Sequence, residues 1–141
     1  MYSSLEPILV WLLIIAVFAF AWAKGGAPER WGVGIVLAGG AFALLVHWGA
    51  PASLHALLLL GGEGAMGLAF LMLALRYASP WLGGAMLFQA IQFSLHAYYL
   101  VGELPRDFTY AVINNIDTLG VLACILLGAL LAWRKRNRLA K

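Results

Sequence analysis

The chain has 141 residues, of which 64% are apolar and only 11% are charged. Soluble domains carry about a quarter charged residues, so this composition excludes an ordinary soluble enzyme and is typical of an integral membrane protein. The formal net charge of +3 does not indicate nucleic-acid binding, because all but one of the nine basic residues lie at the ends of hydrophobic runs.

Five hydrophobic runs follow one another along the chain. Each is close to the roughly 20 residues that a helix needs to cross a bilayer. Turn-forming residues separate the first four runs, with Gly25 and Gly26 after the first, Pro51 after the second and Pro80 after the third, and the polar loop 102–107 precedes the fifth. The sequence therefore predicts one all-α domain over residues 1–141, with five transmembrane helices at about 5–23, 30–48, 53–77, 80–101 and 108–133.

The basic residues predict the orientation of this bundle. With five spans, one side of the membrane holds eight of them: Lys24, Arg30, Arg76, Arg134, Lys135, Arg136, Arg138 and Lys141. Only Arg106 lies on the other side. Because positive charge is retained on the cytoplasmic side, we expect the N-terminus outside and the C-terminus in the cytoplasm.

One acidic residue, Glu63, stands in the apolar stretch 57–70 among four glycines. An ionisable residue inside a span is costly in lipid and marks a candidate functional site. The glycines Gly61, Gly62, Gly64 and Gly67 favour close packing of a neighbouring helix, although such a run also suits a helix that unwinds around an ion.

The other polar residues of the spans lie mostly in the outer half of the predicted bundle. Gln89, Gln92 and His96 fall on one stripe of the fourth span, and Tyr110, Asn114, Asp117 and Cys124 fall on one stripe of the fifth. We therefore expect an intramembrane polar cluster with Glu63 at its inner edge, made of Glu63, Gln89, Gln92, His96, Asn114 and Asp117. Each acid either binds a proton or ion or, more simply, is neutral or hydrogen-bonded and fixes helix packing.

Two cofactor hypotheses remain open. His55 and His96 lie at equal depth on neighbouring predicted spans and are the candidate ligands for haem. Gln89, Gln92 and the Tyr98–Tyr99 pair are alternatives for a quinone. No His or Cys spacing indicates a zinc or copper site, so we predict no metal, and no resident cofactor is expected.

Three short segments are similar to segments of a group of small multi-span membrane proteins from alphaproteobacteria. They are 25–30 (GGAPER) after the first span, 73–76 (LALR) at the end of the third, and Phe88–Gln89 followed by His96 in the fourth. The resemblance covers about residues 20–100 and implies a bacterial inner membrane, with added interest in Gln89 and His96.

Three functions fit these patterns. The first is a non-catalytic accessory or assembly subunit of a larger inner-membrane complex, whose partners are the bilayer and other membrane subunits or further copies of itself. The second is a small carrier or channel for protons or cations that uses Glu63 and Asp117. The third is an electron-transfer subunit that binds haem or quinone.

Overall fold

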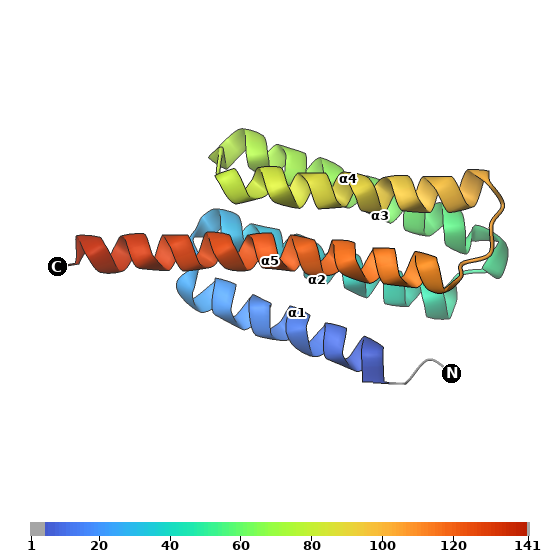
Figure 1. The fold of residues 1–141 in the computed structure, drawn as a ribbon, viewed down its shortest axis with the longest axis horizontal. Helices are drawn as coiled ribbons and strands as arrows, with labels where there is room; N and C mark the ends of the chain where they lie inside the picture. The colour runs from blue at the N-terminus through green and yellow to red at the C-terminus, as the bar shows by residue number, and fades with distance from the viewer. Residues whose placement is uncertain (1–4, 141) are drawn as a thin grey trace.

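The computed structural model describes residues 5–140, and Lys141 of the basic tail lies outside the described residues. It contains five α-helices and no strand within the described chain, which confirms the all-α class. The helices are α1 (Leu5–Lys24), α2 (Ala27–Gly49), α3 (Ala52–Tyr77), α4 (Pro80–Val101) and α5 (Phe108–Leu139). They run roughly antiparallel to their neighbours in chain order (Figure 1).

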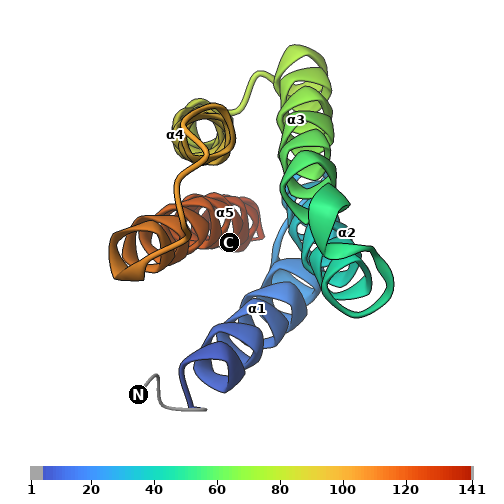
Figure 2. The same ribbon diagram turned by 90° about the vertical axis from the view of Figure 1, so that its right-hand side faces the viewer.

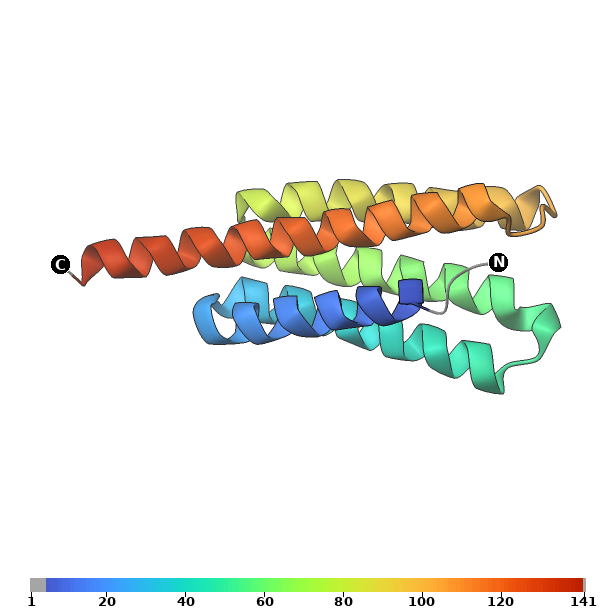
Figure 3. The same cartoon turned by 60° about the horizontal axis from the view of Figure 1, so that its bottom comes forward.

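Two helix ends differ from the predicted bounds by more than one residue. Helix α2 begins at Ala27 rather than near residue 30, because Glu29 bonds back to the preceding turn and Pro28 suits a first helical turn. Helix α5 continues to Leu139, well beyond residue 133, so its basic last turns extend past the other helices (Figures 1 and 3).

The helices close into a ring. Each helix packs against the next one in the chain, and α5 returns to contact both α1 and α2. The view along the bundle shows α4 and α5 on one side, α2 and α3 on the other, and α1 between α5 and α2 (Figure 2). This closed arrangement gives the bundle a common interior to which every helix contributes.

The interior beside the middle of α5 is a core of buried apolar side chains. Val33, Phe70, Leu82 and Ile125 come from four helices and are almost fully buried there. Most other large apolar side chains are exposed on the outside of the bundle, as expected where lipid replaces water. Three helices, α2, α3 and α5, are long and apolar enough to cross a membrane, and α1 contributes a shorter apolar stretch, Ile8–Lys24.

Candidate functional site

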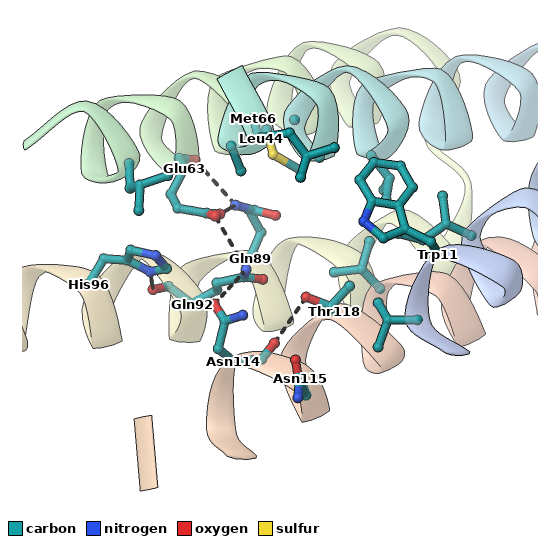
Figure 4. A pocket seen from close by; sticks show the side chains of 18 of the residues that line it. Trp11, Leu44, Glu63, Met66, Gln89, Gln92, His96, Asn114, Asn115 and Thr118 are labelled. Carbon is teal, nitrogen blue, oxygen red and sulfur yellow. Dashed lines mark hydrogen bonds between the residues drawn. The ribbon is translucent and has the colours of Figure 1, made fainter. Parts of the chain in front are cut away.

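Glu63 lies halfway along α3 and is held by the side chains of α4. Gln89 Nε2 donates hydrogen bonds to Glu63 Oε2 at 2.6 Å and to the Glu63 backbone oxygen at 3.2 Å. Gln92 Nε2 donates to Glu63 Oε1 at 3.2 Å, so each carboxylate oxygen has one amide partner (Figure 4). These partners are neutral, so none of them supplies a compensating positive charge.

The network continues from α4 to α5. Gln92 Nε2 also donates to Asn114 Oδ1 at 3.2 Å. Thr118 Oγ1 then donates to the backbone oxygen of Asn114 at 2.9 Å. Three helices are thus joined at one depth by side-chain amides, and the structure brings together Glu63, Gln89, Gln92 and Asn114 of the predicted cluster (Figure 4).

His96 adds a second link between α4 and α5. Its Nδ1 lies 2.9 Å from the Gln92 backbone oxygen, and its Nε2 lies 2.8 Å from the Tyr110 hydroxyl. Since a carbonyl only accepts, Nδ1 carries a proton, and in the neutral ring Nε2 accepts the Tyr110 hydroxyl hydrogen. Both ring nitrogens of His96 therefore already have partners within the bundle.

These polar groups face a cavity of about 380 Å³ in the centre of the bundle. Its polar lining comes from α3, α4, α5 and the loop before α5: Glu63, Gln89, Gln92, His96, Arg106, Tyr110, Asn114, Asn115 and Thr118. Its other walls are apolar and include Trp11 of α1 and Leu44 of α2. A volume of this size is that of a small-ligand site rather than of a single buried water.

One end of the cavity is lined by an exposed residue and the other by buried apolar side chains. Arg106, which is exposed in the loop between α4 and α5, lines the end where that loop lies. Ile14, Val36 and Val121 line the opposite end and belong to the buried apolar core. Glu63 is therefore set in a pocket with a polar mouth and an apolar floor.

The mouth is organised by aromatic and charged residues. The Arg106 guanidinium lies 5.1 Å from the centre of the Tyr110 ring. Asp107 caps α5 by accepting the Tyr110 backbone N–H at 2.9 Å, and it also accepts the Tyr99 hydroxyl hydrogen at 2.9 Å. These bonds, led by the backbone N–H of Tyr110, lower the pKa of the Asp107 carboxyl.

Asp117 is buried but does not line the cavity. Gln92 on α4 and Asn114 on α5 are bonded to each other and are equally far along the chain from Glu103 in the loop that joins the two helices. Gln89 and Asp117 are also equally far from Glu103. Asp117 therefore lies at about the depth of Gln89. Asp117 Oδ2 and Gln89 Oε1 are buried and have no hydrogen-bond partner among the described residues.

Three of the four glycines near Glu63 lie against other side chains. A Cβ added to Gly62 would lie 2.8 Å from the Phe42 ring, one added to Gly64 would lie 3.4 Å from Phe93, and one added to Gly67 would lie 3.7 Å from the Gln89 side chain. An added Cβ at Gly61 would meet nothing within 4 Å, so Gly61 makes no such contact inside the bundle. Close packing therefore involves Gly62 most strongly.

The two candidate haem ligands, His55 and His96, each have other hydrogen-bond partners in this arrangement. His55 Nε2 lies 3.0 Å from the Ala50 backbone oxygen, and its ring lies 6.1 Å from the ring of His47. Iron ligation by His96 would break one of its two existing hydrogen bonds. Within residues 5–140 there is no group of three or more His, Cys, Asp or Glu side chains that could hold a metal ion.

One buried acid was not anticipated as a packing element. Glu29, which is only 4% exposed, accepts a hydrogen bond from Trp81 Nε1 at 2.8 Å and another from the Gly26 backbone N–H at 2.8 Å. The Trp81 ring fills the space beside Gly32 of α2 and Gly128 of α5. This contact closes the end of the bundle opposite the cavity mouth.

Comparison of the chain with protein-family models, curated proteins and solved structures gives no match. The chemical role of the cavity therefore follows from its own residues.

Proposed function

We propose that this protein crosses a bacterial inner membrane five times, with its N-terminus outside and its C-terminus in the cytoplasm. Successive helices turn back at alternate ends of the bundle, which supports five crossings (Figure 1). Helix α4 is not among the three helices that are apolar enough to span by composition, and its polar residues Gln89, Gln92 and His96 are buried inside the bundle. The basic end of α5 is the cytoplasmic end by the positive-inside rule.

Within this membrane protein, we propose that the central cavity binds a small ligand whose polar group donates hydrogen bonds or carries positive charge. The observation that supports this most strongly is the Glu63 carboxylate, which lines a cavity of about 380 Å³ and is bonded only to neutral amides. A carboxylate accepts about four hydrogen bonds. Each oxygen of Glu63 therefore keeps acceptor capacity for a ligand.

The positions of the two acids distinguish binding from conduction. Glu63 lines the cavity, whereas Asp117 does not. Of the two acids in the carrier hypothesis, Glu63 is therefore the one that can contact a ligand in the cavity. The floor is made of buried apolar side chains, and a continuous path for ions needs polar or hydrated groups along its length. Ligand binding at Glu63 is the function that fits this geometry best.

Calorimetric titration of the protein in lipid nanodiscs with propylammonium tests the proposal. Glu63→Gln removes the charge and one acceptor, and we expect at least tenfold weaker binding. The control variant Glu103→Gln removes a carboxylate from the exposed α4–α5 loop and should bind like the parent protein. Absence of propylammonium binding by the parent protein, or equal binding by Glu63→Gln, would contradict the proposal.

A role as an accessory or assembly subunit is a second candidate. It is favoured by Gly34, Gly61 and Gly83, where an added Cβ would meet nothing within 4 Å, so the backbone is open to the approach of another helix. Native electrophoresis after gentle solubilisation of the source membrane tests this role. Migration only as a free monomer would contradict it.

A further inference from the structure

A second cavity lies on the outward side of α2 and α3. It measures about 450 Å³ and is lined only by apolar side chains and glycines, among them Ala38, Phe42, Leu57 and Ala65. All four are exposed at the surface of the bundle. In a membrane, this α2–α3 groove therefore faces the lipid chains.

The groove and the polar cavity are adjacent and share lining residues. Gly39 and Met66 line both of them. The Met66 side chain lies over Gly39, in the space that a Cβ on Gly39 would occupy, and Figure 4 shows Met66 beside Glu63 at the cavity wall. Methionine is unbranched and has three rotatable side-chain bonds, so it can change rotamer without moving the backbone.

The mouth is less suited than the groove to admit a positively charged group. Arg106 lines the mouth, and a fixed guanidinium there repels cations that arrive from water. A third cavity, between α3 and α4, also meets the polar one, but the Gln89–Glu63 hydrogen bond of 2.6 Å lies at that boundary. Passage between α3 and α4 would break this bond. Between α2 and α3, the side chain that lines both cavities is that of Met66, which can change rotamer without breaking a hydrogen bond.

We infer that the ligand of the proposed binding function is a single-chain amphipathic molecule that enters from the bilayer between α2 and α3. Its hydrogen-bonding or cationic head group reaches Glu63, and its apolar chain lies in the α2–α3 groove. Met66 is the gate between the two compartments. This inference rests on the proposed function, because it takes Glu63 as the site of the head group.

The test uses dodecylammonium with a photoreactive diazirine at the end of its chain, added to the protein in lipid nanodiscs. After irradiation, mass spectrometry of peptides locates the label. We expect labelling of the groove residues on α2 and α3, with competition by unlabelled dodecylammonium and little competition by dodecanoate. Labelling confined to other faces of the bundle would overturn the inference.

Two matched variants separate the groove from the head-group site. Ala65→Phe fills the groove and should reduce labelling at least tenfold, whereas Ala41→Phe, at an exposed position that lines none of the three cavities, should not. Propylammonium has no long chain and should bind Ala65→Phe as well as it binds the parent protein. Unchanged labelling of Ala65→Phe would overturn the inference while leaving the proposed function intact.

Two further outcomes are also decisive. Failure of propylammonium to bind the parent protein would overturn the proposed function itself. A second copy of the chain could instead cover the groove and block labelling, and a dimer cross-linked through α3 would show this. That result would identify the groove as a protein interface and overturn the inference.

Discussion

Gln89 on α4 donates its amide hydrogen to the Glu63 carboxylate on α3 at 2.6 Å, and this bond lies at the wall of the central cavity. It places a carboxylate and the amide that orients it on two different helices. The geometry of the ligand site therefore depends on how α3 and α4 pack, and packing and binding are open to separate tests.

Gln92 joins Glu63 to Asn114, so replacing it should destabilise the bundle. Gln92→Leu removes two hydrogen bonds between helices, which in membranes average about 0.6 kcal/mol each, so we expect a loss of about 1 kcal/mol. Unfolding in mixed micelles by dodecyl sulfate measures this loss. Ser94→Ala on the exposed side of the same helix is the control and should change stability little, and equal effects of the two would contradict the network.

Trp81 should stabilise the closed end of the bundle through its bond to Glu29. Trp81→Phe keeps an aromatic ring but removes the indole Nε1–H, which leaves the buried carboxylate without one donor. We expect a loss of about 1.5–3 kcal/mol, the usual range for a hydrogen bond to a charged group. Trp31→Phe, at a position that is 64% exposed, should be nearly neutral in the same unfolding assay. If Trp81→Phe were equally neutral, the Nε1–Glu29 bond would have no stabilising role.

Glycine should be required at residue 120 and dispensable at residue 83. A Cβ at Gly120 would lie 2.6 Å from the Phe88 ring, so Gly120→Ala should destabilise the α4–α5 contact by about 1–3 kcal/mol. A Cβ at Gly83 meets nothing within 4 Å, and alanine is the better helix former, so Gly83→Ala should be neutral or stabilising by up to about 1 kcal/mol. Melting temperatures of the two variants in one detergent give the comparison, and the reverse order would contradict the packing of α4 on α5.

Asp107 should make the start of α5 sensitive to acid. Its pKa in the folded protein is lowered from the ordinary 3.8, so its stabilisation is full above pH 3.8 and is lost as the pH falls through the lowered pKa. The protection of the Tyr110 amide against hydrogen exchange should therefore decrease in acid. Asn also caps helices but does not titrate, so protection in Asp107→Asn should not vary with pH, and the same acid sensitivity in both proteins would contradict this role.

Much of the fold follows from simple sequence signals. Runs of apolar residues, interrupted by Gly25, Pro51 and Pro80, were sufficient to predict five helices and most of their ends. The early start of α2 depends on Glu29, which favoured the helix N-terminus by its charge but gave no sign of its distant partner Trp81. A contact between residues so far apart in the chain depends on how α2 and α4 are rotated, and periodicity does not fix that rotation.

The sequence predicts the depth of the site residues in the bundle, but only partly which of them face the cavity. Because a short loop joins α4 to α5, residues equidistant from Glu103 meet, and this explains the pairs Gln92–Asn114 and His96–Tyr110. Spacing also predicts Asp117 on the stripe of Asn114, yet Asp117 is not part of the cavity lining. The charge of Arg106 indicates only membrane topology in the sequence, although its place in the same short loop brings it to the cavity mouth.

The most direct test is the reaction of single cysteines with a water-soluble, membrane-impermeant thiol reagent in sealed vesicles of each orientation. In a Cys124→Ala background, Thr118→Cys lines the cavity, whereas Ala129→Cys lies in the fully buried core of the same helix. We expect Thr118→Cys to react only when the α4–α5 loop faces the reagent, and Ala129→Cys not to react from either side. If Thr118→Cys were as unreactive as Ala129→Cys, the cavity around Glu63 would be sealed from water, contrary to a ligand site with a polar mouth.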